Sequence, residues 1–275
     1  MQNNDGRPDA GSPFALPAKG SPGAGSWRVR RRETDVRTFL VAGSPVGLPP
    51  LGLAPWPDDR VIAVDLGTRQ ALSWGWPVHL VMGDLDSLPH EDAMRLAAEG
   101  MPMIIAPAAK DETDLELGLA QALAEGAQEI FICAALGGRT DHLLANILLL
   151  TRPDLAGRRI TIVDGRQTVL VLHGDDAGDD TAHARDATHG EIGPSVCAAL
   201  SGQPGDLLSL LPVGGDAVGV TTEGLLYPLH NERLLLGRAR GVSNEFVSAA
   251  ARVWVRQGSL LIVHTRCDGE THSGT

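Results

Sequence analysis

Short apolar runs alternate with helix-length segments through the first half of the chain. Strand-like runs lie at residues 36–43, 60–67, 77–84, 101–107, 129–136 and 158–165. Helical patterns lie between them, at residues 68–75, 89–100, 111–126 and 140–152. Apolar strands separated by helices are typical of βαβ units on a parallel sheet. The pattern therefore predicts an α/β domain with a mostly parallel sheet over residues 35–165.

One helical segment shows its period plainly. Leu115, Leu119 and Leu123 are spaced by four residues, which places them on one face of a helix. Gly126 follows this apolar face and is a typical C-terminal stop signal. We therefore expect a helix within residues 111–126 that ends close to Gly126.

After residue 166 the pattern changes to short β-leaning runs separated by Gly, Pro and Asn. No convincing helix interrupts them, so an all-β, sandwich-like domain is predicted over residues 166–268. Two of its strands are expected at residues 206–213 and 217–224. The acidic segment 175–192 is interpreted as a surface-loop insertion, and residues 1–34, rich in Gly, Pro, Ser and Asn, as a disordered tail.

Composition narrows the class of protein. The chain has 275 residues and a formal net charge of −11, which makes a nucleic-acid backbone a poor candidate partner. Its apolar stretches are too short to span a membrane. Cys133, Cys197 and Cys267 form no CxxC pair, so neither a disulfide framework nor a zinc knuckle is expected. These features favour a cytoplasmic protein.

Five aspartates and a lysine follow three of the predicted strands. They are Asp65, Asp84, Asp86, Lys110, Asp111 and Asp114. Because ligands of parallel α/β sheets bind beyond the carboxyl ends of the strands, these side chains are expected to converge there. Five converging carboxylates would repel one another strongly without bound cations, and oxygen ligands suit Mg²⁺. Taken singly, Asp65 and Asp111 also fit ordinary helix caps.

Gly137 and Gly138 precede Arg139 at the start of another predicted helix. Backbone N–H groups at such a start, together with a fork-shaped guanidinium, can bind phosphate oxygens. The two glycines could also serve only to turn the chain. Carboxylate-held Mg²⁺ beside a phosphate-binding loop indicates phosphoryl or pyrophosphoryl transfer.

Six motifs resemble those of one known family, the thiamine pyrophosphokinases (thiamine diphosphokinases). In the first half they are GDLDS at 83–87, KDETD at 110–114 and GGRTDHLLAN at 137–146. In the second half they are GDLLSLLPVGG at 205–215, GVTTEGLLYPL at 219–229 and GVSNEF at 241–246. The resemblance covers roughly residues 36–265, and the motifs stand in the family's order.

The resemblance implies a homodimer with shared active sites. It implies transfer of a diphosphate group from ATP to thiamine, giving thiamine diphosphate and AMP, with Mg²⁺ as cofactor. The implied metal ligands are Asp65, Asp84 and Asp86. The implied catalytic set is Asp65, Asp84, Asp86, Asp111, Asp114 and Arg139.

The resemblance also implies which residues bind the two substrates. The implied ATP-binding residues are Lys110, Thr113, Gly137, Gly138, Arg139, Asp141 and His142. Thiamine would be bound by the neighbouring subunit's copies of Tyr227, Ser243 and Asn244. The acceptor of the thiamine hydroxyl proton stays open among Asp84, Asp86 and Asp114.

The chain leaves the family pattern at Leu66. The family usually has ADGG at the end of the second strand, and this chain has VDLG, with Leu66 in place of the first glycine. A glycine there would permit a positive φ or a close backbone approach. Leucine at a positive φ would cost about 1–2 kcal/mol, so Leu66→Gly is expected to raise thiamine affinity or turnover. If the backbone has instead adapted to leucine, the variant should lose roughly 0.5–1 kcal/mol of stability without helping activity.

Three other functions stay open. A pterin diphosphokinase would apply the same chemistry to 6-hydroxymethylpterin, but the β domain argues against it. GDLDS suggests a haloacid-dehalogenase-type phosphatase, although that family usually has its nucleophilic aspartate near the first strand. Leu66 suggests a catalytically degenerate thiamine- or nucleotide-binding protein. Detection of thiamine diphosphate and AMP as products separates these functions.

Overall fold

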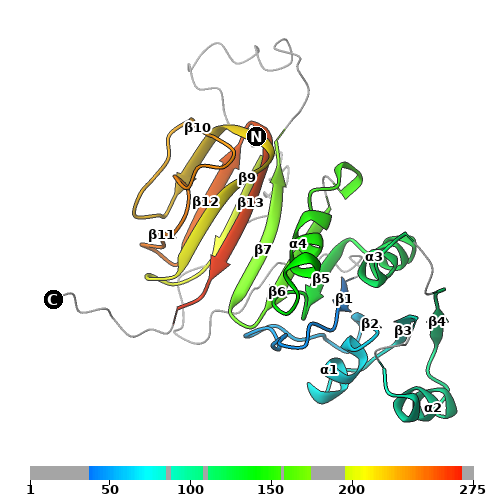
Figure 1. The fold of residues 1–275 in the computed structure, drawn as a ribbon. Helices are drawn as coiled ribbons and strands as arrows, with labels where there is room; N and C mark the ends of the chain where they lie inside the picture. Colours follow the sequence, from blue (N-terminus) through cyan, green and yellow to red (C-terminus); the bar gives the residue numbers. More distant parts are fainter. Residues whose placement is uncertain (1–36, 85–87, 108–110, 156–157, 175–195, 268–275) are drawn as a thin grey trace, which may run out of the picture.

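The computed structural model describes residues 37–84, 88–107, 111–155, 158–174 and 196–267 (Figure 1). Four features predicted from the sequence lie outside these ranges: the tail at 1–34, the acidic loop at 175–192, Asp86 and Lys110. None of the described helices is long and apolar enough to cross a membrane.

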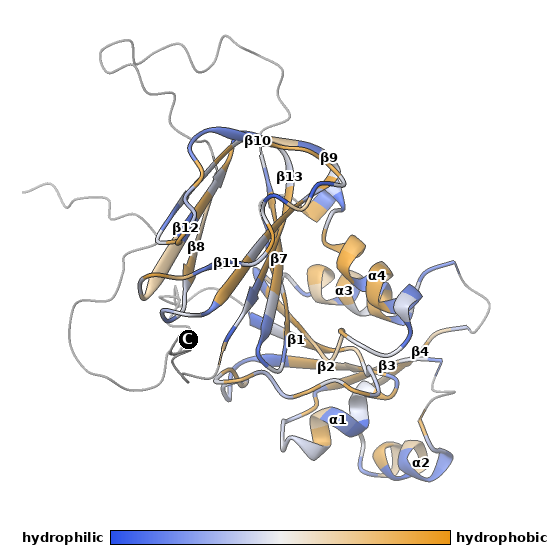
Figure 2. Ribbon diagram, turned by 60° about the vertical axis from the view of Figure 1, so that its left-hand side comes forward, coloured by the Kyte–Doolittle hydropathy of each residue, from blue (hydrophilic) through white to orange (hydrophobic). Residues whose placement is uncertain are grey.

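The first unit is the predicted α/β domain with a parallel sheet. Its strands are β1 (Arg37–Val41), β2 (Arg60–Val64), β3 (Leu80–Gly83), β4 (Met103–Ile105), β5 (Glu129–Cys133) and β6 (Arg159–Asp164). All neighbouring pairs are parallel, in the order β4-β3-β2-β1-β5-β6. The helical elements are α1 (Gly67–Ser73), α2 (His90–Ala98), α3 (Asp114–Ala124), α4 (Thr140–Leu149) and the 3₁₀ turn η1 (Pro153–Leu155). Helices α3 and α4 cover one face of the sheet, and α1 and α2 the other (Figure 2).

The core of this unit explains why its strands read as continuous apolar runs. Every residue of β1 is buried, as are the last four residues of β2, because helices lie on both faces. The predicted leucine face of α3 packs here: Leu115 and Leu119 are buried and Leu123 lies against them. The helix ends at Ala124, and Gly126 follows with φ +85°, as the stop signal predicts.

The second unit is antiparallel, and its described residues form strands and no helix, as predicted. These are β7 (Gln167–His173), β8 (Val196–Ser201), β9 (Leu207–Glu223), β10 (Glu232–Leu234), β11 (Asn244–Glu245), β12 (Ala250–Val255) and β13 (Gln257–Thr265). The path continues from β6 through β7-β13-β9-β12-β8, while β10 and β11 pair with β9. A separate apolar cluster that includes Leu210, Phe246 and Ile262 fills this unit.

The prediction of two strands at 206–213 and 217–224 is wrong. The structure has one strand of 17 residues, β9, which pairs with β13 on both sides of an irregularity in register. Gly214 and Gly219 adopt positive φ, +75° and +72°, within this strand. Glycines at such positions form bulges that bend a strand without ending its ladder.

The strand order determines where a ligand can bind. From β1 the chain adds β2, β3 and β4 on one side, and then returns to add β5 and β6 on the other side of β1. This reversal is a topological switch point, and in open parallel sheets the ligand crevice lies there, beyond the carboxyl ends of the strands. Residues that follow β1, β2, β3 and β5 are therefore the first candidates for a functional site.

Candidate active site

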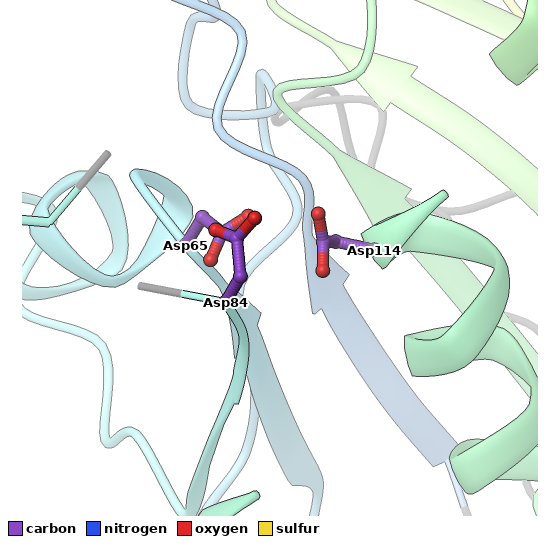
Figure 3. A group of neighbouring side chains, drawn as sticks. All are labelled: Asp65, Asp84 and Asp114. Atoms are coloured by element: carbon purple, nitrogen blue, oxygen red, sulfur yellow. The ribbon is translucent and has the colours of Figure 1, made fainter. Parts of the chain in front are cut away.

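Three aspartates meet at the carboxyl edge of the parallel strands. Asp65 follows β2, Asp84 follows β3, and Asp114 begins α3, which crosses back over the sheet. One carboxylate oxygen from each lies within 4.8 Å of the other two, and all three side chains are half-buried. Figure 3 shows Asp65 and Asp84 side by side, with Asp114 facing them. We refer to these three residues as the acidic cluster.

The backbone under the acidic cluster has little freedom. Asp65 has φ +46°, and its N–H donates to the Met82 carbonyl at 2.9 Å. Gly83 has φ +135°, and a Cβ atom there would lie 1.8 Å from Asp65 Oδ1. The glycine thus lets the carboxylate of Asp65 lie directly over the end of β3, beside Asp84.

The backbone at Leu66 does not have the positive φ that a glycine there would permit. Leu66 lies in the right-handed helical region, at φ −58° and ψ −22°, immediately before α1. The special geometry belongs to its neighbours: Asp65 carries the positive φ, and a Cβ at Gly67 would lie 1.9 Å from the Val41 carbonyl oxygen. Leucine at position 66 therefore causes no backbone strain.

This geometry favours the second of the two outcomes expected for Leu66→Gly. We expect the variant to lose roughly 0.5–1 kcal/mol of unfolding free energy through added chain entropy, with no gain in thiamine affinity or turnover. Thermal unfolding and steady-state kinetics of the variant test this. A rise in turnover would contradict the geometry at this position.

Asp114 is positioned by a capping box at the start of α3. Thr113 Oγ1 accepts from the Glu116 N–H at 3.2 Å, and the Thr113 N–H donates to Glu116 Oε2 at 2.9 Å. The alternative interpretation of Asp111 as the helix cap is therefore wrong. Asp111 is exposed and lies outside the acidic cluster, three residues before Asp114.

The Gly-Gly-Arg loop lies at the start of α4, on the other side of β1. Gly137 and Gly138 have φ +83° and +70°, and Cβ atoms there would lie 2.3 Å from Val46 Cγ2 and 3.2 Å from Pro45 Cδ. The loop is therefore packed closely against residues 44–46, which follow β1. This packing holds the N-terminal N–H groups of α4 at the same sheet edge as the acidic cluster.

Arg139 precedes the first helical residue of α4 and is exposed. Its guanidinium forms a two-pronged ion pair with Asp141, with a shortest distance of 2.6 Å. The pair raises the pKa of Arg139 and lowers that of Asp141. An exposed pair of this kind contributes little to stability, so Arg139 is free to turn towards a phosphate. His142 is also exposed, and its N–H donates to Asp141 Oδ1 at 3.0 Å.

Sequence reasoning missed three polar residues around this loop. Asp164, at the end of β6, accepts from the N–H groups of Leu48 (2.7 Å) and Leu136 (3.1 Å), and burial raises its pKa. It ties together the loops that follow β1 and β5. Ser44 Oγ and Gln70 Oε1 are buried and make no hydrogen bond within the described part of the chain. The position of Asp164 at a strand end was the available signal; Ser44 and Gln70 gave none.

A second candidate region lies in the antiparallel unit. Asn244 is buried, and its side chain is engaged with Tyr227: Oδ1 accepts from the Tyr227 N–H at 3.0 Å and Nδ2 donates to its carbonyl at 2.7 Å. Tyr227 as a whole residue is 65% exposed. Ser243 is exposed at φ +58°. Asn244 thus positions an exposed aromatic ring.

A hollow of about 460 Å³ adjoins this ring. It is lined mainly by apolar residues, with Arg240 and Asn244 as its polar members. Arg240 is ion-paired with Glu232, so its charge is largely offset. A flat, partly apolar ligand fits this environment better than a phosphate.

Both candidate regions lie within domains that match those of known proteins. Residues 56–163 match the thiamine pyrophosphokinase catalytic domain, and residues 199–261 match the vitamin B1 binding domain of the same family. The thiamine pyrophosphokinase of Bacillus subtilis (strain 168) is 28% identical over 228 residues, covering 82% of this chain and 97% of that protein.

Solved structures of the same family share the fold. The crystal structure of the Bacillus subtilis enzyme has a TM-score of 0.69 at 25% identity, covering 84% of this chain and 99% of that one. The Geobacillus thermodenitrificans structure has a TM-score of 0.68 at 26% identity, covering 86% and 99%. The yeast thiamin pyrophosphokinase, 13% identical, shows the fold alone, with a TM-score of 0.60 and coverage of 85% and 87%.

Proposed function

The chain belongs to the thiamine pyrophosphokinase family, whose members transfer a diphosphate group from ATP to thiamine, and from this premise we propose how its residues divide that work. The observation that carries the proposal is the convergence of Asp65, Asp84 and Asp114 at the switch point of the sheet. The reaction forms a bond between the thiamine hydroxyl oxygen and the β-phosphorus of ATP. The bond from that phosphorus to the α-phosphate oxygen breaks, and AMP leaves.

The acidic cluster has the chemistry of a Mg²⁺ site. Its ligands are oxygens only, from three different elements, and they are half-buried. Octahedral Mg²⁺ holds its oxygens at about 2.0–2.1 Å, so opposite ligands lie about 4 Å apart and the observed spread of 4.8 Å needs only small side-chain rotations. Asp86 would join this set from outside the described residues. Bound Mg²⁺ would neutralise the phosphate oxygens around the reacting phosphorus.

The phosphates of ATP would lie between this metal site and the Gly137-Gly138-Arg139 loop. The N–H groups at the start of α4 and the exposed guanidinium of Arg139 would hold phosphate oxygens, which favours in-line geometry. Lys110, outside the described residues, would add a second cation. Asp141 and His142 lie beside this loop, while Thr113 would act by fixing the start of α3.

The proton of the thiamine hydroxyl must pass to a base within hydrogen-bond reach. The carboxylates of Asp84 and Asp114, together with Asp86, are the candidates in the acidic cluster and beside it. Thiamine itself would be held at the hollow beside Tyr227, where an exposed aromatic face suits a planar, cationic ligand. Asn244 would position that ring, and exposed Ser243 would border it.

The two half-sites favour a homodimer with shared active sites. Asp84 follows β3, and Asn244 lies in β11, which pairs with β9. Seven steps separate β3 from β9 in the sheet. At about 4.8 Å per step, they are roughly 30 Å apart measured along the sheet. That path is longer than one thiamine diphosphate can span, so the hollow of one subunit would complete the acidic cluster of its partner.

The activity test is incubation of the full chain with thiamine, ATP and Mg²⁺, followed by separation of the products. Thiamine diphosphate and AMP should form in equal amounts. ADP in place of AMP would indicate transfer of a single phosphoryl group. A product with 6-hydroxymethylpterin but none with thiamine would indicate a pterin diphosphokinase, and thiamine binding without product would indicate a degenerate binding protein.

The shared site predicts that two inactive variants rescue each other. In a mixture of Asp84→Asn and Tyr227→Ala subunits, half of the randomly formed dimers would be mixed and would contain one intact site. We therefore expect recovery of about a quarter of the wild-type activity. Activity after subunit exchange, followed by mass-tagged subunits, measures this.

A matched pair provides the control. Asp84→Asn mixed with Asp114→Asn damages the same half-site in both subunits, so no activity should return. If the first mixture stays inactive although exchange is complete, each site is built from one chain.

A further inference from the structure

A second cavity lies at the opposite end of the parallel strands from the acidic cluster. It has a volume of about 210 Å³ and lies at the junction of the two units, where β6 and β7 run side by side (Figure 1). Arg37, Glu129 and Arg159 are the first residues of β1, β5 and β6, and all three line it. The acidic cluster follows the carboxyl ends of the same sheet, so the two sites do not overlap.

The floor and walls of this cavity are apolar and come from both units. Strands β5 and β6 contribute Phe131 and Ile160, while β7 and β8 contribute Leu170, Leu172 and Ala198. Because apolar lining favours an apolar ligand body, one part of an occupant must be hydrophobic. Pockets for drug-sized ligands occupy roughly 300–1,000 Å³, so this smaller cavity suits a body of about ten to fifteen non-hydrogen atoms.

Arg37 is a buried cation at one end of the cavity. It is 8% exposed, and its guanidinium lies 4.7 Å from the centre of the Trp56 ring and 5.3 Å from that of Phe131. Its nearest carboxylate oxygens, on Asp59 and Glu129, are 3.6 and 3.7 Å away, beyond hydrogen-bond length. Within the described part of the chain, Arg37 Nε has no hydrogen-bond partner. A buried charge with only loose ion pairs keeps capacity for an anion.

The charge around the cavity favours the same kind of ligand. Among the described residues that line it are three arginines, Arg37, Arg158 and Arg159, and one carboxylate, that of Glu129. Asp59, which is ion-paired with Arg37, lies outside the lining. Glu129 is shared between Arg37 and Arg159, at 3.7 Å from each. The exposed Arg158 forms none of these ion pairs. Even with Asp59 counted, these described side chains carry a net positive charge beside an apolar floor.

We propose that this cavity binds a small organic anion: one acidic group held by the arginines, on an apolar body that packs between β6, β7 and β8. The site is distinct from the ATP and thiamine sites and does not depend on the proposed function. An occupant would touch both units of the fold at once. Carboxylates, sulfonates and phosphate esters share the required chemistry.

The test uses the full chain and naphthalene-2-sulfonate as the probe in isothermal titration calorimetry. Naphthalene-2-sulfonamide, which has the same shape without the charge, is the matched ligand control. We expect a dissociation constant below about 1 mM for the sulfonate. The sulfonamide should bind about tenfold more weakly, and added salt should weaken only the sulfonate. Saturating Mg²⁺-ATP should not displace the probe.

Two variants locate the binding site. Arg158→Gln/Arg159→Gln should raise the dissociation constant of the sulfonate about tenfold and leave that of the sulfonamide unchanged. Ala198→Phe should fill the cavity and abolish binding of both. Arg238→Gln, an exposed arginine elsewhere on the antiparallel unit, is the control and should change neither. All variants should keep their unfolding temperature and their turnover.

Three results would overturn the proposal. These are absence of sulfonate binding below about 1 mM, equal affinities for the two naphthalenes, and displacement of the probe by ATP. If Ala198→Phe fails to fold, Arg158→Gln/Arg159→Gln still tests the proposal. Unchanged sulfonate affinity in this double variant would contradict an anion held by the arginines of this cavity.

Discussion

Asp84→Asn should lower the turnover of diphosphate transfer by at least about 100-fold without destabilising the folded chain. Asparagine keeps the size of the side chain but removes one of three negative charges whose oxygens lie within 4.8 Å of one another. In Mg²⁺-free buffer, relief of that repulsion should leave the unfolding free energy unchanged or raised. Steady-state kinetics and thermal unfolding measure the two effects.

Magnesium titration gives this prediction a readout besides activity. A ligand that binds only the folded state raises the unfolding temperature with its concentration, so wild-type protein should be stabilised by Mg²⁺ and Asp84→Asn much less. Asp92→Asn makes the same charge change on α2, where the side chain is ion-paired with Arg69 on the surface. That variant should behave like wild type. Near-normal turnover of Asp84→Asn, with a clear loss of stability, would instead assign Asp84 a structural role.

Gly83→Ala should lower turnover at least about tenfold by displacing the carboxylate of Asp65. The added Cβ would lie 1.8 Å from Asp65 Oδ1, so the carboxylate of Asp65 has to leave the acidic cluster. Loss of one of three ligands should weaken Mg²⁺ binding by about tenfold or more and reduce turnover to a similar or greater extent. The φ of +135° adds a cost of about 1–3 kcal/mol in unfolding free energy.

Gly100→Ala separates the clash from the backbone strain. Gly100 also has a positive φ, +77°, but a Cβ there would have no atom within 4 Å. Both variants should lose stability, while only Gly83→Ala should lose Mg²⁺-dependent stabilisation and turnover. Equal activity in the two variants would show that the contact between Gly83 and Asp65 is unimportant.

Local patterns were sufficient to predict the strands and helices of the α/β unit, but not every strand of the antiparallel unit. The strands of the first unit are buried on both faces, so β1 and β2 read as unbroken apolar runs. Helix α3 could be predicted from a leucine face and a glycine stop, because both signals lie within one segment. The single strand β9 was predicted as two, since Gly214 and Gly215 read as a turn when the pairing with β13 is unknown.

The residues of the acidic cluster were predicted only as members of a larger set. Asp111 and Asp114 look equivalent in sequence, three residues apart. The capping box of Thr113 and Glu116 begins α3 at Asp114, which turns that carboxylate to the cluster and leaves Asp111 exposed. Asp164 was not recognised, because its partners, the N–H groups of Leu48 and Leu136, are distant in sequence.

The sequence by itself determined the two-unit architecture and the family, and it placed acidic residues at strand ends, because periodicity, stop signals and motifs are local properties of the chain. Tertiary structure alone decided which carboxylates meet and which residue carries the positive φ, Asp65 instead of Leu66. It also decided that Arg37, Glu129 and Arg159 gather around an apolar cavity, since these residues become neighbours only when β1, β5 and β6 align in register. Side-chain meetings of this kind depend on distances between segments that are far apart in the chain.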